Sequence, residues 1–205
     1  MYDWPAADGL CGGSPHMHLA CSEAYVVIEG QGTVQTLTWS GYAETPLTPG
    51  TVVTFLPGTI HRLINTDTRL RILVIMQNSG LPEAGDAVLT FPPDVLASSK
   101  KYGAATTGDT RKRRDLAVEG FLQLRAEGMT ALDSFHKAAM NIVSTRLDTF
   151  EQRWQEGAHA ASEATRTHLN ALRHHNPTHL RAATVTTLTQ HPRPGMCGHL
   201  QTYTP

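Results

Sequence analysis

The amino-acid sequence predicts an all-β barrel followed by an α-helical C-terminal extension. Up to about residue 80, short runs of β-branched and aromatic residues alternate with turns that contain glycine or proline, which is typical of a sandwich or barrel. Beyond about residue 110, apolar residues recur at three-, four- and seven-residue spacing, which is typical of amphipathic helices. Charge divides similarly: residues 1–100 hold four Lys or Arg against nine Asp or Glu, and residues 101–205 hold 13 against nine. The sequence therefore predicts two parts of different character.

Strand-like runs fill most of the first part, and each one ends at a turn signal. A further strand is expected to begin after Pro57 and Gly58, and an extended segment is expected around His16. An all-helical interpretation would leave a glycine or proline break in every element. The runs, in chain order, are AYVVIE (24–29), TVQTLTW (33–39), ETPL (44–47), TVVTFL (51–56) and RLRILVIMQ (69–77).

The second part has three stretches of helical periodicity, near residues 116–122, 130–155 and 163–175. The middle stretch has the clearest pattern, and Thr130 with Asp133 three residues later resembles a capping signal. We therefore assign residues 1–95 to the barrel, 96–110 to a linker, and 111–205 to a helical extension that ends in a loosely ordered tail.

Composition excludes several classes of protein. The net charge of −1 is too small for a nucleic-acid binder driven by overall charge, and 40% hydrophobic residues is too many for a disordered chain. The sequence contains no run of about 18 apolar residues, so it predicts no membrane span. Its first residues lack the pattern of a signal peptide. Three cysteines without a CxxC pair argue against a disulfide framework, so we expect a cytoplasmic protein.

Three histidines and one glutamate in the strand region form a candidate metal site. His16 and His18 are two residues apart, so on a strand both imidazoles point to one face. Glu23 lies on the next strand, and His61 follows the Pro57-Gly58 turn. Three imidazoles and one carboxylate suit a divalent Fe, Mn, Ni, Co or Zn ion. Four protein ligands leave a coordination position open for substrate or water.

The spacing of these residues resembles the two motifs of the cupins. The first motif is HxH, three or four residues, Glu, six residues, Gly; here it is His16-Met17-His18, Glu23 and Gly30. The second is Gly, five residues, PxGxxHxxxN; here it is Gly50, Gly58, His61 and Asn65. Leu56 replaces the expected proline, and Leu10 replaces a glycine expected before the first histidine. These departures concern turn geometry and leave the ligand positions intact.

The resemblance covers roughly residues 10–80 and implies a small jelly-roll barrel, or double-stranded β-helix, in which the four ligands converge. Cupins usually carry one or two strands before the first motif, whereas only 15 residues precede His16 here. Either the N-terminus is short, or a swapped strand or the C-terminal part covers the exposed edge. Because an uncovered edge invites pairing with another chain, we expect a homodimer.

The expected function is that of a metalloprotein that acts on a small-molecule ligand rich in oxygen. The chemistry would be dioxygenase-type or isomerase-type, which this ligand set does not separate. Glu23 would neutralise part of the metal charge and act as a base. Tyr25 lies two residues further along the same strand, so its side chain should face the same cavity. It would be a hydrogen-bond donor, an acid or base, or an aromatic residue of the barrel wall. The alternative function is a non-catalytic sensor or small-molecule-binding cupin.

Other residues receive simpler interpretations. Cys21 is expected to be a buried thiol, and the basic run 111–114 a solvated linker rather than a nucleic-acid site. Phe55, Trp39 and Gln77 are further candidates for the pocket.

Overall fold

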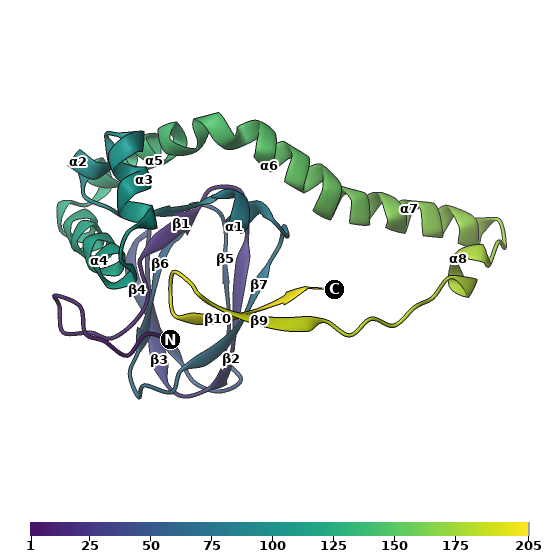
Figure 1. Cartoon of the computed structure of the whole chain (residues 1–205), viewed down its shortest axis with the longest axis horizontal. Coiled ribbons are helices and arrows are strands. Elements are labelled where there is room, and N and C mark those ends of the chain that lie inside the picture. The colour runs from purple at the N-terminus through teal and green to yellow at the C-terminus, as the bar shows by residue number, and fades with distance from the viewer. Residues whose placement is uncertain (205) are drawn as a thin grey trace.

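The computed structural model describes residues 1–204, which form two facing antiparallel sheets, a group of helices and a C-terminal hairpin (Figure 1). The larger sheet has the order β4-β3-β6-β1-β8 and the smaller one the order β5-β2-β7. Their strands are β1 (His16–His18), β2 (Glu23–Glu29), β3 (Gly32–Thr38), β4 (Gly41–Leu47), β5 (Val52–Phe55), β6 (Ile60–Asn65), β7 (Arg71–Met76) and β8 (Ala87–Leu89). All the predicted strands are present, and β8 is an additional one.

The two sheets adopt the cupin fold that the sequence predicted, with one difference from the expected barrel. Within residues 1–204 no hydrogen-bonded ladder joins the sheets into one closed ring of strands. Alternation along β2 explains how the sheets face each other, because Glu23, Tyr25 and Val27 are buried while the residues between them are partly exposed. The apolar cluster between the sheets consists of Tyr25, Val27, Val34, Leu47, Phe55, Leu63 and Leu70.

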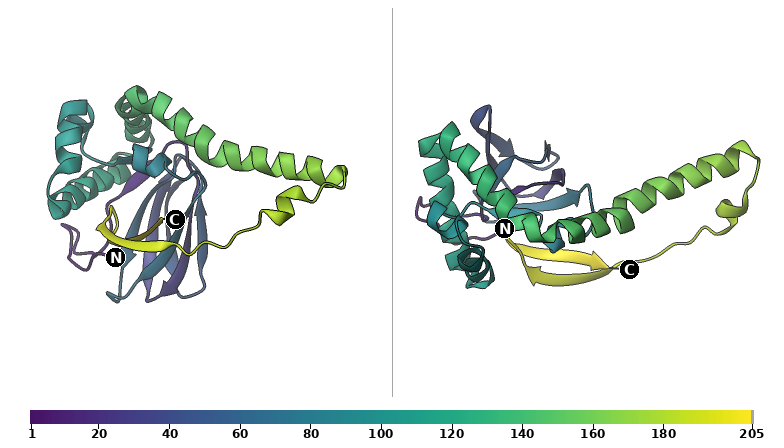
Figure 2. Two further views of the ribbon diagram at one scale, coloured as in Figure 1. Left: turned by 45° about the vertical axis from the view of Figure 1, so that its right-hand side comes forward. Right: turned by 90° about the horizontal axis from the view of Figure 1, so that it is seen from above.

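A second apolar cluster lies on the other face of the larger sheet, where helices cover it (Figure 2). Met17 is the cross-strand partner of Ile60, and both are buried in this cluster with Phe121 and Phe135 from the helices. Strand β1 therefore directs its two histidines between the sheets and Met17 toward the helices. The helical part thus stabilises the strand that carries two candidate ligands. The helices that precede the long C-terminal one are α1 (Leu81–Ala84), α2 (Pro93–Leu96), α3 (Ser99–Thr107) and α4 (Thr110–Glu127).

The C-terminal helices follow one another almost without interruption and extend beyond the sheets (Figure 1). The expected capping signal at Thr130 is wrong, because the helix begins after Gly128, which has a φ of 75°, and no side chain caps it. The predicted helix at 163–175 corresponds to α7, and none of its residues is buried. The series consists of α5 (Met129–Val143), a 3₁₀ turn (Ser144–Arg146), α6 (Leu147–Trp154), a π-helical turn (Gln155–His159), α7 (Ala160–Arg173) and α8 (Thr178–Arg181).

Three segments differ from their sequence-based descriptions. The expected linker at 96–110 contains α3, and the expected loose tail contains the hairpin of β9 (Thr189–Pro194) and β10 (His199–Thr204). The run 111–114 is not a solvated linker, since it forms the start of α4 and the Arg114 side chain is fully buried. Its guanidinium donates to the carbonyls of Trp4 and Pro5, so it binds the N-terminal segment to the helices. No helix in the described part of the chain is long and apolar enough to cross a membrane.

Candidate metal centre

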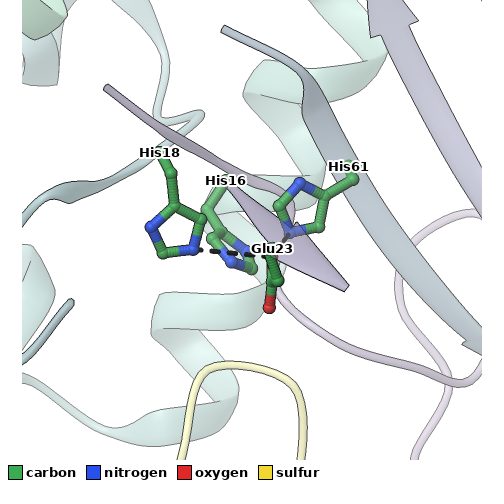
Figure 3. Close-up of side chains that lie close together, drawn as sticks. All are labelled: His16, His18, Glu23 and His61. Carbon is green, nitrogen blue, oxygen red and sulfur yellow. Dashed lines mark ion pairs between the residues drawn. The ribbon is translucent and has the colours of Figure 1, made fainter. Parts of the chain in front are cut away.

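The four predicted ligand residues lie together between the two sheets (Figure 3). His16, His18 and His61 come from the larger sheet, and Glu23 comes from the facing strand β2. One nitrogen or oxygen from each side chain lies within 4.8 Å of the others, and none of the side chains is more than 6% exposed. Among the His, Cys, Asp and Glu side chains of residues 1–204, these four lie close enough together to hold a metal ion.

Strand register brings the histidines together. His16 is the cross-strand partner of His61, and their ring centroids are 4.3 Å apart. The Oε2 atom of Glu23 lies 3.0 Å from Nε2 of His61 and 3.6 Å from Nε2 of His18. Because one-residue slippage of β1 would move both of its histidines to the helix-covered face, the packing of Met17 against Ile60 also fixes the site.

Each imidazole is held through its Nδ1 atom by an oxygen outside the group. Nδ1 of His16 lies 2.9 Å from the Ser14 carbonyl, and Nδ1 of His61 lies 3.1 Å from the Thr59 carbonyl. Nδ1 of His18 lies 3.0 Å from Oδ2 of Asp86. Since these oxygens can only accept hydrogen bonds, each Nδ1 carries a proton, and the Nε2 atoms are left to face the centre. This arrangement is typical of histidines that bind metals.

Asp86 is part of the site, and the sequence analysis missed it. Its carboxylate is fully buried and accepts hydrogen bonds from the backbone N–H groups of Leu19, Ala20 and Cys21 as well as from His18. Burial raises the pKa of Asp86, but the hydrogen bonds from His18 and Ala20 outweigh burial, so its pKa is lower than usual. The only local signal was the short apolar run that forms β8 directly after Asp86.

The electrostatics of the group favour a bound cation. Burial raises the pKa of Glu23, but contact with His61 and the electrostatic interaction with the three imidazoles outweigh burial and lower the pKa to about 2. Burial, followed by repulsion from His61 and His18, places the pKa of His16 well below its usual value. At neutral pH the group therefore combines a carboxylate with a neutral His16, which are the forms that bind metals.

Two buried polar atoms at the centre of the group bear on whether these residues fit a metal ion. Oε2 of Glu23 and Nε2 of His61 have no hydrogen-bond partner, although both are buried. Leaving such buried atoms unpaired is costly. A divalent cation bound to both atoms would remove this cost, and the donor set of imidazoles and one carboxylate suits a borderline metal. The residues present fit the group that the sequence predicted.

The other candidate pocket residues divide into two sets. Tyr25 is buried 5.9 Å from the His61 ring, and Phe55 stacks on His61 with centroids 4.7 Å apart. Both line the space between the sheets. Trp39 is 54% exposed and lies beside His136, and Gln77 is exposed, so neither lies in this space.

Cys21 is the buried thiol that the sequence predicted, packed among the apolar residues that the helices cover. Burial and the neighbouring Asp86 carboxylate raise its pKa to about 12. The thiol therefore stays protonated and behaves as a small apolar side chain.

Comparison with known proteins agrees with this geometry. Residues 7–76 match the family described as "Cupin domain". A search of curated proteins found no match.

Two solved structures match part of this chain. One is described as "Putative sugar phosphate isomerase" from Acidithiobacillus ferrooxidans, and it is 31% identical over 31% of this chain and 39% of its own, with a TM-score of 0.27. The other is the capsular polysaccharide assembling protein CapF from Staphylococcus aureus, 19% identical over 38% of this chain and 23% of its own, with a TM-score of 0.35. This chain thus spans well under half the length of either protein. From the family match and the two facing sheets, residues 7–76 are a cupin domain, which carries a helical C-terminal extension.

Proposed function

We propose that this protein binds one divalent metal ion between its two sheets and acts there on a small, oxygen-rich molecule. One observation carries the proposal: three imidazoles whose Nδ1 atoms are already hydrogen-bonded direct their Nε2 atoms toward a buried carboxylate.

When bound, the metal would supply Lewis-acid or oxygen-activating chemistry, corresponding to an isomerase or a dioxygenase. The three histidines and Glu23 would hold the ion, and the Glu23 carboxylate would neutralise part of its charge. Burial and the nearby Glu23 carboxylate raise the pKa of Tyr25 well above its usual value. Tyr25 therefore keeps its proton at neutral pH, which favours a hydrogen-bond donor over a base.

Metal analysis of protein purified without chelator tests the metal site. Wild-type protein should hold about one equivalent of a divalent ion, and His16→Ala should hold much less. His174→Ala is the matched control, because His174 is exposed at the end of α7. Equal metal content in the wild type and His16→Ala would refute the proposal.

Turnover is tested on the metal-loaded protein with candidate diols, diketones and catechols. Oxygen consumption that depends on substrate would select the dioxygenase, and an isomeric product without oxygen consumption would select the isomerase. The alternative function, a sensor, would bind a ligand tightly and release it unchanged. The extended α6–α7 arm supports this alternative, because its exposed surface is available to transmit occupancy to a partner.

We also propose a cytoplasmic homodimer, with residues 1–95 and 111–205 as its two structural parts. The outer face of the smaller sheet supports the dimer, because Val26 pairs with both Val52 and Leu73 there. Val52 and Leu73 are 61% and 47% exposed, and Ile75 beside them is 50% exposed. A contiguous exposed apolar face of this kind is typical of a protein interface.

A further inference from the structure

The turn of the C-terminal hairpin lies beside the apolar cluster between the two sheets, although its Cys197 is 174 residues from Glu23 and 136 residues from His61 in sequence. Its backbone pairs with the N-terminal segment there: the N–H of Ser14 donates to the Met196 carbonyl at 3.0 Å, and the N–H of Tyr2 donates to the Cys197 carbonyl at 3.3 Å. Ser14 also accepts the hydrogen bond from Nδ1 of His16. One residue thus contacts both the hairpin and a candidate ligand.

Side chains anchor the same turn. The Tyr2 hydroxyl and the Arg113 guanidinium both donate to the Gly195 carbonyl, at 2.7 Å and 2.9 Å. The rest of the C-terminal arm does little to hold the hairpin, because neither α7 nor α8 has a buried residue. The position of the turn therefore depends on these contacts near its tip.

Cys197 directs its side chain into the space between the sheets, where it packs against the apolar cluster that includes Tyr25 and Phe55. The fit is close, since a Cβ atom added at Gly13 would lie 2.7 Å from the Cys197 sulfur. Figure 3 shows the pale yellow turn below Glu23. Burial, followed by the Glu23 carboxylate, raises the pKa of this thiol to about 12, so the side chain is neutral.

The space that Cys197 enters also contains buried polar atoms without a hydrogen-bond partner. Glu23 and His61 are 6% and 1% exposed, and Oε2 of the first and Nε2 of the second lack hydrogen-bond partners. These atoms lie between the sheets, where Cys197 of the turn at residues 195–198 packs against the same apolar cluster as Tyr25 and Phe55. A molecule bound at the candidate metal centre would therefore face the turn.

We propose that this turn is a wall of the substrate cavity and that Cys197 limits the size of the molecule that reaches the metal group. The inference rests on the proposed function for its substrate class. A neutral thiol presents an apolar surface, so the favoured ligand is a small chelating molecule with oxygens toward the metal and a short apolar side toward Cys197.

The first experiment tests the position of the turn without any metal. Cys197 in the full-length protein is alkylated with iodoacetamide, and the rate is followed by peptide mass spectrometry. The double variant Tyr2→Phe/Arg113→Gln removes both side-chain anchors on Gly195 and should raise the rate at least about tenfold. Arg111→Gln, an exposed change in the same basic run, should leave it unchanged. A rate in wild-type protein equal to that in urea, or no effect of the double variant, would overturn the inference.

The second experiment tests the role of Cys197 as a wall, with 4-nitrocatechol as the chelating probe and the metal-loaded protein. Cys197→Trp should weaken binding at least about tenfold because added bulk does not fit a packed cavity, whereas Cys197→Ser should stay within about threefold of wild type. Metal content should be equal in all three proteins. Equal binding by Cys197→Trp would overturn the inference and leave the proposed function intact. A wild-type protein without metal would refute the function, while alkylation still decides where the turn lies.

Discussion

Oδ2 of Asp86 lies 3.0 Å from Nδ1 of His18, and the same carboxylate accepts hydrogen bonds from three backbone N–H groups of the loop that follows His18. This loop leads directly from β1 to β2 and therefore determines the distance between His18 and Glu23. Asp86 thus orients one candidate ligand and holds the connection to another. We regard it as a positioning residue, because it does not face the centre itself.

Asp86→Asn should weaken metal affinity about tenfold or more, because a neutral amide no longer enforces the Nδ1-protonated form of His18. Affinity is measured by competition with a coloured chelator, and circular dichroism checks that the fold is retained. Asp94→Asn, at an exposed carboxylate on α2, is the control. Wild-type affinity in Asp86→Asn would show that the hydrogen bond does not support metal binding.

Stability of the metal-free protein should depend on pH through His16. Its pKa is well below the usual 6.5 in the folded state, so the unfolded state binds the proton first as the pH falls. The free energy of unfolding should therefore decrease below about pH 6.5, by up to about 1.4 kcal/mol per pH unit. Glu23 adds to this at lower pH: its folded pKa of about 2 lies below the ordinary 4.5, so its contribution is lost as the pH falls below 4.5.

Urea unfolding at several pH values, in the presence of a chelator, measures this dependence. His16→Gln should make the decrease in unfolding free energy that begins near pH 6.5 smaller and should keep the decrease that begins near pH 4.5. His136 is also partly buried with a lowered pKa, so the difference between wild type and His16→Gln is the relevant quantity. An identical pH dependence in both proteins would contradict the assignment.

The parts of the fold and site that the sequence predicts are those with a local pattern. Alternation along β2 and the HxH spacing on β1 place Glu23, His16 and His18 on inward faces, and all three are buried in the structure. Asp86 follows a segment rich in proline and glycine, and only tertiary structure brings it to His18, 68 residues away. The Cys197 turn and the Arg114 contacts are likewise long-range, so no periodicity could have revealed them.

The outer face of the smaller sheet should be the dimer interface. Leu73→Lys places a charge at one end of the apolar row formed by Val52, Val26 and Leu73, so it should convert dimer to monomer in sedimentation equilibrium. Leu172→Lys changes an equally exposed leucine on α7 and should have no effect. If Leu172→Lys dissociates the dimer and Leu73→Lys does not, the helical arm and not the sheet forms the interface.

Two glycines in neighbouring helices should respond oppositely to alanine. At Gly120, in α4, an added Cβ would lie 2.0 Å from the Thr90 carbonyl oxygen, so α4 must shift away from the strand layer. Gly120→Ala should therefore lower the free energy of unfolding by about 1–3 kcal/mol. At Gly103, in α3, the same atom would meet nothing within 4 Å, so Gly103→Ala should raise stability by up to about 1 kcal/mol through helix propensity. Urea denaturation measures both. Equal effects at the two positions would mean that α4 does not pack closely on the strand layer, and that the helical extension does not support the strand carrying His16 and His18.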